Sequence, residues 1–248
     1  MRAIALVDLD DTLFQTLRKC PPDIPREALT PLGFARDGSA LSYATPRQLN
    51  FISWLSETAW LVPVTARSRD ALERVRIEMG AAICAHGGMI IGGNGRPEPE
   101  WVGHVARAAA PHMAMLDRLA QGAQSADPGL SVRIVTEEGG PGLYLLLKHP
   151  DWDEEALGRA VDLLRPEVPA DWTIHRNGNN AAFLPPFLGK RHAVEWLLPR
   201  LRALHPDTPV IGIGDSLTDA PFMALCDFAM MPTGSQLSAA ALEPLARC

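Results

Sequence analysis

The chain has 248 residues, 47% of them hydrophobic, and a formal net charge of -6 at pH 7. This length suits either one large domain or a core with an inserted second module, and the composition is that of a soluble globular protein. The sequence has no basic run and no stripe of interleaved basic and aromatic residues, which argues against a nucleic-acid partner. It also has no apolar run of membrane-spanning length, so we expect a cytoplasmic protein without membrane association.

The four cysteines are scattered, without a CxxC pair or any other paired spacing. This pattern is typical of reduced thiols in a cytosolic protein, and it indicates neither a disulfide framework nor a zinc site. The residues are Cys20, Cys84, Cys226 and Cys248.

Short uninterrupted apolar runs, each ending in a small or polar residue, predict the buried strands of a parallel sheet. These runs lie at residues 3–7, 60–64, 82–85, 210–213 and 228–231. Helical patterns separate them, which is the order of an α/β fold. The helices are expected at residues 46–57, with Thr45 as N-cap, at 69–79 and at 190–198.

Between residues 92 and 186 the order changes to helix, two strands, helix and two strands. This order predicts a small antiparallel sheet backed by helices, inserted into the parallel core. Asp151 and Glu154 form the expected capping box of the second helix. The helices are expected at residues 98–121 and 151–165, and the strands at 132–137, 143–148, 172–175 and 181–184.

Asp8 and Asp10 come directly after the first predicted strand. Side chains alternate in direction along a strand, so these two carboxylates point the same way while Leu9 points into the protein. Like charges about 4 Å apart repel by several kcal/mol at a protein surface, so a proton or a cation must neutralise them, and a divalent metal with oxygen ligands is the simplest answer. For this pair alone, a solvated turn that begins at Asp11 and Thr12 is an equally good interpretation.

Asp215 and Asp219 follow the strand predicted at residues 210–213, at the carboxyl end where open α/β sheets bind ligands. Asp219 alone is also explained as the cap of the next helix. Two strands that both end in acidic residues nevertheless favour a metal, because like charges buried together cost stability unless a cation is bound.

Thr65, Ala66 and Arg67 follow the second predicted strand, where a hydroxyl and the amides of a helix start would suit a phosphate. Lys190 follows Gly189 and begins a helical pattern. Taken singly, Thr65 is more simply explained as a helix cap and Lys190 as a solvated surface charge.

In this order, the four elements resemble the motifs of the haloacid dehalogenase superfamily of phosphohydrolases. The family pattern Asp-x-Asp-x-Thr is met by Asp8, Asp10 and Thr12, its strand-terminal Thr or Ser by Thr65, its lysine by Lys190, and its Gly-Asp-x-x-x-Asp by Gly214, Asp215 and Asp219. The resemblance covers residues 1–90 and about 186–240. The long insertion between the second and third motifs resembles the subgroup with a large α/β cap, which includes sucrose-phosphate, trehalose-phosphate and mannosylphosphoglycerate phosphatases and the Cof-type enzymes.

The resemblance implies an α/β fold, with a Rossmann-like parallel-sheet core at residues 1–90 and 186–248 and a cap domain at residues 91–185. It implies a Mg²⁺-dependent phosphatase that hydrolyses a small phosphorylated metabolite, such as a sugar, polyol or glycerate-type phosphate, through an aspartyl-phosphate. A sugar phosphomutase with the same motifs and a non-catalytic phospho-metabolite-binding protein are the alternatives.

Each motif residue then has an implied role. Asp8 is the nucleophile and Asp10 the acid and base. Thr65 and Lys190 bind the phosphoryl group together with Ala66 and Arg67. The implied metal site comprises Asp8, the backbone oxygen of Asp10, Asp215 and Asp219, of which Asp219 positions Lys190 or a metal-bound water.

The chain departs from the subgroup at Lys190-Arg191, where Lys-Gly is usual, and at Thr65-Ala66-Arg67, where Thr-Gly-Arg is frequent. Residues 14–44 form a longer link than usual, either an enlarged flap over the site or a surface loop. In the cap, glycines beside polar groups suggest substrate contacts, but hairpin turns are the more common explanation. These cap candidates are Glu137 to Gly140, Lys148, His149 and Arg176 to Asn180, and His86 is a candidate for the cleft or the hinge.

Overall fold

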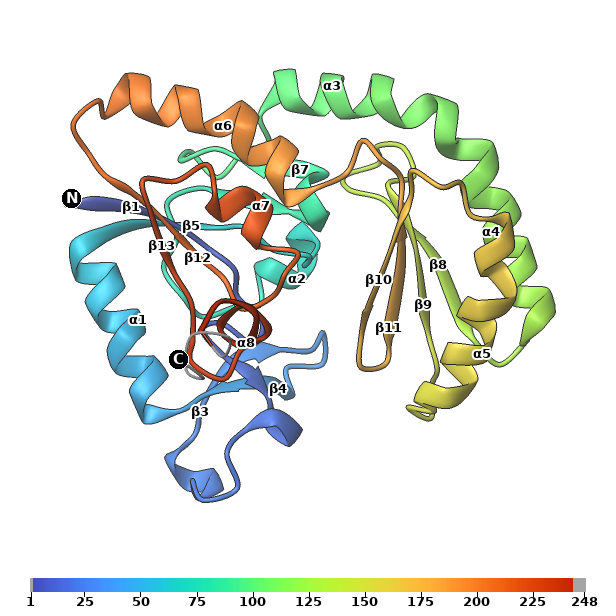
Figure 1. The fold of residues 1–248 in the computed structure, drawn as a ribbon, viewed down its shortest axis with the longest axis horizontal. Coiled ribbons are helices and arrows are strands. Elements are labelled where there is room, and N and C mark those ends of the chain that lie inside the picture. The colour runs from blue at the N-terminus through green and yellow to red at the C-terminus, as the bar shows by residue number, and fades with distance from the viewer. Residues whose placement is uncertain (1, 243–248) are drawn as a thin grey trace. The chain divides into compact units, whose positions relative to one another are not determined.

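The computed structural model describes residues 2–242, so Cys248 lies outside the described residues. By its contacts the chain forms two compact units, which we call the first unit (residues 1–98 and 189–248) and the second unit (residues 99–188) (Figure 1). Cys20, Cys84 and Cys226 are free thiols. Within residues 2–242, no helix is long and apolar enough to cross a membrane.

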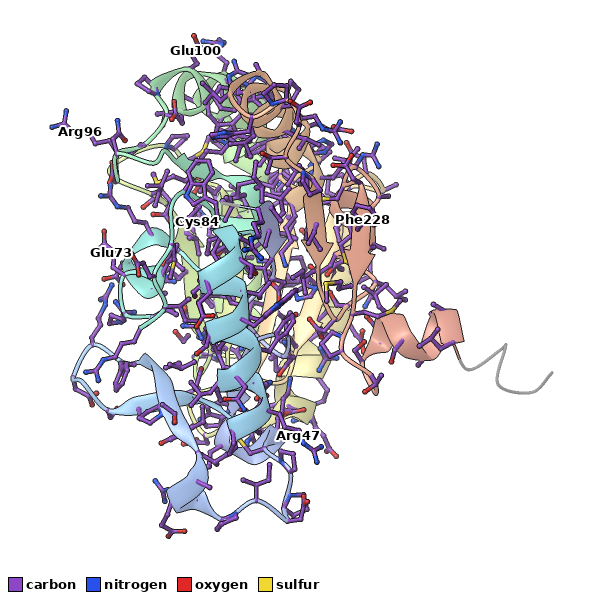
Figure 2. All side chains as sticks on the ribbon, turned by 90° about the vertical axis from the view of Figure 1, so that its left-hand side faces the viewer. Arg47, Glu73, Cys84, Arg96, Glu100 and Phe228 are labelled. Carbon is purple, nitrogen blue, oxygen red and sulfur yellow. The ribbon has the colours of Figure 1, made fainter. Side chains whose placement is uncertain are left out.

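The first unit is built on a parallel sheet with the strand order β13-β12-β1-β5. Its strands are β1 (Ala3–Val7), β5 (Ala59–Pro63), β12 (Val210–Ile213) and β13 (Phe228–Met230). Every residue of β1 is buried, as the continuous apolar run predicts for a strand flanked on both sides. Phe228 on the edge strand is 63% exposed, whereas Cys84 of the same unit is fully buried. Figure 2 labels both residues.

Helix α1 (Pro46–Thr58) begins where the sequence predicts. The Thr45 hydroxyl accepts a hydrogen bond from the Gln48 backbone N–H, and the Gln48 side chain accepts one from the Thr45 N–H, which completes a capping box. Ile52 and Leu55 on its inner face pack in the core cluster that lies on the sheet. The other helices of the unit are α2 (Arg69–Leu72), α6 (Lys190–Leu204), α7 (Ala220–Met223) and α8 (Gln236–Leu242).

The helix predicted at residues 69–79 is wrong beyond α2. The Phe34 N–H donates to the Arg74 carbonyl and the Arg76 N–H donates to the Leu32 carbonyl, so residues 74–76 run beside a strand of the 15–44 segment. Pairing with a distant strand satisfies the backbone here, and this tertiary contact overrides a helical periodicity that the local sequence contains.

The strand predicted at residues 82–85 is present as β6 (Ala82–Cys84), but it is not a full member of the parallel sheet. It forms an antiparallel hairpin with β7 (Met89–Ile91) and shares only an isolated bridge, Val64 to Ile83, with the chain that follows β5. Ala85 and His86 adopt positive φ of 50° and 56°, which reverses the chain in the short 3-10 helix η3 (Ala85–Gly87).

The segment between the first strand and α1 is not an irregular loop. It contains a three-stranded antiparallel sheet in the order β2-β4-β3 and two short 3-10 helices. These elements are β2 (Gln15–Thr16), η1 (Leu17–Lys19), η2 (Arg26–Ala28), β3 (Thr30–Phe34) and β4 (Ala40–Ala44), and we call them the flap.

The second unit is an antiparallel sheet in the order β10-β11-β9-β8, packed on helices through one apolar cluster. The single helix predicted at residues 98–121 is interrupted by a 3-10 turn that contains Pro111, because proline lacks the N–H that a helix interior requires. The elements are α3 (Pro99–Ala109), η4 (Ala110–His112), α4 (Met113–Ala126), β8 (Ser131–Val135), β9 (Tyr144–Lys148), α5 (Glu154–Leu164), η5 (Arg165–Glu167), β10 (Thr173–Asn177) and β11 (Asn180–Leu184).

The cap of α5 also differs from the prediction. Asp153, and not Asp151, accepts hydrogen bonds from the backbone N–H groups of Glu155 and Ala156. Trp152 adopts a positive φ of 59°, which delays the start of the helix by two residues.

Removing the cap of α1 should weaken the first unit measurably. Thr45→Ala deletes the hydroxyl that satisfies the Gln48 N–H, so we expect the free energy of unfolding to fall by about 1 kcal/mol, seen as a lower urea midpoint. Ser56→Ala, at an exposed position of the same helix, is the matched control and should leave the midpoint unchanged or slightly raised, because alanine is the better helix former. Equal midpoints for Thr45→Ala and the parent protein would contradict the assignment.

Candidate functional site

The residues singled out by the four motifs meet at one end of the parallel sheet in the first unit. Asp8 directly follows β1, Thr65 follows β5, Asp215 follows β12, and Lys190 is the first residue of α6. Because the strands are parallel, their carboxyl ends lie at the same edge, and loops that are distant in the sequence converge there.

A buried lysine joins two of the carboxylates. Lys190 Nζ donates to Asp8 Oδ1 at 2.5 Å and to Asp219 Oδ1 at 2.6 Å. Burial lowers the pKa of Lys190, but the two carboxylates outweigh it, so the pKa is raised and the ammonium stays charged. Burial raises the pKa of Asp8 to about 7, against the opposing effect of Lys190 and with a further rise from Asp219.

Asp215 completes an acidic cluster that suits a divalent cation. Asp8, Asp215 and Asp219 each offer an oxygen atom, and these atoms lie within 4.8 Å of one another. Burial raises the pKa of Asp215 to about 6, with a further rise from the charge of Asp219. Three carboxylates and one ammonium leave two negative charges uncompensated when all are ionised, and hard oxygen ligands are those that Mg²⁺ prefers.

Thr12 connects the first and last motifs. Its hydroxyl oxygen lies 3.2 Å from Asp8 Oδ2 and 3.1 Å from Asp215 Oδ1, so its single proton can be donated to either carboxylate. Thr12 is the threonine of the Asp-x-Asp-x-Thr pattern, but the sequence alone did not indicate these two contacts.

Asp219 is held so firmly that positioning explains its contacts better than direct metal binding. Its Oδ2 accepts hydrogen bonds from the Ser216 N–H at 3.0 Å and the Ser216 hydroxyl at 2.8 Å, while Oδ1 accepts from Lys190. A Cβ at Gly214 would lie 2.5 Å from the Asp219 Cβ, so only glycine allows this close approach.

Thr65 is fully buried and is fixed by the hairpin behind it. Its Oγ1 accepts from the Arg67 N–H at 3.1 Å, and its backbone carbonyl accepts from the His86 N–H. The hydroxyl proton has no acceptor among residues 2–242, as a phosphate-binding hydroxyl requires. Ala66 lies between Thr65 and Arg67, but α2 has only four residues, so the amides of a long helix do not contribute here.

Arg67 contacts Asp10, a pairing that the sequence did not indicate. Its Nε and Nη2 atoms donate to the two carboxylate oxygens of Asp10, each at 2.7 Å, and Nη2 also lies 3.1 Å from Ser42 Oγ on the flap strand β4. Burial lowers the pKa of Arg67, but the contact with Asp10 outweighs it and the pKa is raised. The carboxylate of Asp10 is therefore held by Arg67, whereas that of Asp8 is held by Lys190.

The remaining motif carboxylate, Asp11, is paired with Lys19 of the flap at 2.5 Å. Ser42, Ser216 and Thr12 are the contacts that sequence reasoning missed. Serines are common in turns and strands, so no sequence signal distinguished Ser42. Ser216 lies within the Gly-Asp-x-x-x-Asp motif, so its place beside Asp219 could have been predicted from the sequence.

The cap candidates are mainly turn residues. Residues 137–140 and 177–180 form turns of the two hairpins in the second unit, with positive φ at Glu138, Gly139 and Gly178. The backbone of His149 is bound through both its N–H and its carbonyl by the side chain of Asn179, so this contact joins the end of β9 to the second turn.

Comparison with known proteins rests on structure alone, since no protein-family model and no curated sequence matches the chain. The sucrose-phosphatase from Synechocystis sp. PCC6803, solved with sucrose and phosphate, is similar with a TM-score of 0.52 and 17% identity over 100% of this chain and 98% of that chain. The C-terminal domain of C. albicans trehalose-6-phosphate phosphatase has a TM-score of 0.56 and 16% identity over 89% and 72%. A haloacid dehalogenase-like hydrolase from Bacteroides thetaiotaomicron has a TM-score of 0.50 and 14% identity over 100% and 99%.

These likenesses span the parallel-sheet core and the inserted antiparallel unit together, because each covers most of both chains. They confirm the fold that the four motifs predicted. The chain has the fold of the haloacid dehalogenase phosphatases, with an inserted α/β cap.

Proposed function

We propose that this protein is a Mg²⁺-dependent phosphatase that acts in the cytoplasm on a small phosphorylated metabolite, a sugar, polyol or glycerate-type phosphate. The observation that carries the proposal is the buried contact of Lys190 with Asp8 and Asp219, which places a fixed cation beside the nucleophile. A phosphoryl group needs such a cation, because an anionic carboxylate otherwise repels it.

In the first half-reaction, an Asp8 oxygen attacks phosphorus and the bond to the departing oxygen breaks. Asp10 gives its proton to that oxygen, leaving an aspartyl-phosphate on Asp8. Lys190 and the Thr65 hydroxyl bind the equatorial phosphoryl oxygens, where negative charge accumulates. In the second half-reaction, Asp10 takes a proton from water, which attacks phosphorus and releases inorganic phosphate from Asp8.

The metal would be held by Asp8 and Asp215, with the backbone oxygen of Asp10 as a further ligand and Asp219 in support. Their hard oxygen atoms and their excess negative charge fit Mg²⁺. When bound, Mg²⁺ supplies charge neutralisation of the phosphate, which lets an anionic nucleophile approach. The Thr12 hydroxyl, within reach of both Asp8 and Asp215, keeps the two carboxylates oriented before the metal binds.

The substrate class is supported by the sugar-phosphate phosphatases among the similar structures. Two alternatives share the motifs. A phosphomutase would isomerise a sugar phosphate without net phosphate release, and a non-catalytic sensor would bind a phospho-metabolite without converting it. A panel of phosphorylated sugars, polyols and acids, assayed for released phosphate and for isomer with Mg²⁺ and with EDTA, separates all three.

Asp8→Asn should reduce kcat by at least about a thousandfold, because the amide cannot attack phosphorus. Asp10→Asn should cost about a hundredfold or more through loss of the proton transfer. Phosphate release from the best substrate of the panel is the measurement. Asp11→Asn is the matched control in the same loop, since Asp11 pairs with Lys19, and it should keep most of the activity. Full Mg²⁺-dependent activity of Asp8→Asn would overturn the scheme.

The stabilisation of the protein by Mg²⁺ should depend strongly on pH. The pKa of Asp8 is raised to about 7 and that of Asp215 to about 6, so between about pH 4 and 7 the metal-free folded state binds more protons than the unfolded state. The contribution of these two groups to stability without metal therefore falls as the pH rises through this window. Mg²⁺ needs ionised carboxylates, so its effect on Tm should be larger at about pH 8 than at about pH 5.

Thermal unfolding with saturating Mg²⁺ and with EDTA at both pH values measures this difference. Asp215→Asn should remove most of it, whereas Asp117→Asn, at an exposed position of α4, should not. A Mg²⁺ effect of equal size at both pH values would show that these carboxylates do not hold the metal.

Arg67 should act by positioning Asp10. Arg67→Lys keeps the positive charge but loses the two-oxygen contact, so we expect kcat to fall by about tenfold with little change in the Mg²⁺ requirement. Arg69→Lys, two residues on and paired with Glu73, is the control and should behave like the parent. A higher KM with unchanged kcat for Arg67→Lys would instead assign Arg67 to substrate binding.

A further inference from the structure

The sheet of the second unit has two chemically different faces. Leu145, Leu147, Ala181 and Phe183 pack in one buried cluster with residues of α4 and α5. Side chains alternate along a strand, so the residues between these positions point to the opposite face. We call that side the cationic face, after its members Arg133, Lys148 and His175.

The register of the sheet places these groups around a small apolar centre. Arg133 is opposite Leu146, Leu146 is opposite Ala182, and Ala182 is opposite His175, so the four residues form one row across the strands. Lys148 is two residues beyond Leu146 on the same face and is therefore a diagonal neighbour of Arg133. The centre of the row has only short or flexible side chains between the flanking cations.

None of the strand residues on the cationic face is Asp or Glu. Within residues 2–242, Arg133 and Lys148 form no ion pair, although both are exposed. Elsewhere among the described residues several arginines are paired with carboxylates. The pairs include Arg36 with Asp70, Arg67 with Asp10, Arg69 with Glu73, Arg191 with Glu195 and Arg202 with Asp227.

Two adjacent cations without a carboxylate repel each other. Partial burial of the otherwise exposed Lys148 lowers its pKa, and the charge of Arg133 lowers it further. Burial raises the pKa of Tyr144 on this face, and Glu137, which follows β8, raises it further. Along β9, Tyr144 and Lys148 lie on opposite sides of Leu146. Glu137 therefore lies toward the end of the strands that is farther from Lys148. An anion would relieve the repulsion that this arrangement contains.

We propose that the cationic face binds an oxyanion, a carboxylate or phosphate group of a small metabolite, through Arg133 and Lys148. The planar guanidinium of Arg133 offers two parallel N–H donors to such a group, and Lys148 adds a point charge from the neighbouring position. The anion is either a second acidic group of the substrate or a separate effector. Its binding does not depend on the catalytic role proposed above.

Binding can be tested without turnover. Full-length ¹⁵N-labelled protein is titrated with malonate, and with the neutral isostere malonamide as control, while backbone amide signals are followed by NMR. Malonate should shift the signals of residues 131–133 and 146–148 saturably, and malonamide should not. The double variant Arg133→Gln/Lys148→Gln should bind malonate at least about tenfold more weakly.

Arg118→Gln is the matched control, because Arg118 is an exposed arginine of α4 in the same unit. It should bind malonate like the parent protein. Equal malonate binding by the double variant, or the absence of saturable shifts on β8 and β9, would overturn the proposal.

A kinetic comparison identifies the source of the anion, and this arm alone rests on the proposed phosphatase activity. Glycerol 3-phosphate and 3-phosphoglycerate differ by a carboxylate, and glucose 6-phosphate and glucose 1,6-bisphosphate differ by a second phosphate. If the anion belongs to the substrate, the double variant loses kcat/KM only for the member of a pair with the extra group. If it is a separate effector, both members respond to the double variant equally and malonate changes the parent's rate. Unchanged kinetics with unchanged malonate binding would reject both.

Discussion

The site depends on one buried cation held between two carboxylates. Lys190 Nζ lies within 2.6 Å of oxygens of both Asp8 and Asp219, and the carboxylates come from loops at the ends of two adjacent strands. Without this ammonium, three carboxylates within 4.8 Å would repel one another in a poorly solvated place. With it, two negative charges remain when all four groups are ionised, which favours a divalent cation. Lys190 thus reduces the repulsion between the carboxylates in the metal-free site, and the site keeps a net negative charge.

The two aspartates of the first motif, Asp8 and Asp10, have different surroundings. Their spacing gives them a common direction, yet they have different partners: Asp8 faces Lys190 and Thr12, while Asp10 faces Arg67. In the proposed mechanism Asp8 attacks phosphorus and Asp10 transfers a proton, so the two carboxylates need different surroundings. The fold provides the separate partners by placing Arg67, which follows the neighbouring strand β5, against Asp10.

Much of this arrangement was predictable where the local sequence decides the structure. The runs at residues 3–7 and 210–213 are buried strands with the predicted bounds, and Thr45 and Gln48 form the cap of α1. The prediction was wrong for residues 74–76, whose backbone forms hydrogen bonds with β3 and not with a helix. It was also incomplete for β6, because positive φ at Ala85 and His86 reverses the chain and β6 pairs with β7 in a hairpin. The Arg67 contact with Asp10 was equally hidden, because no spacing rule relates residues 57 positions apart.

The flap explains how these loops are kept in place. Lys19 binds Asp11 in the turn between Asp8 and Thr12, and Ser42 contacts the guanidinium that holds Asp10. The flap is also tied to the helix beside it, since Gln48 of α1 donates to the Gln15 side chain. The contacts of Lys19 and Ser42 join the flap to loops of the candidate site within the same unit. A long irregular loop could not fix two motif loops at once, so the three-stranded sheet in this segment is best understood as the support that holds the aspartates of the first motif in unequal surroundings.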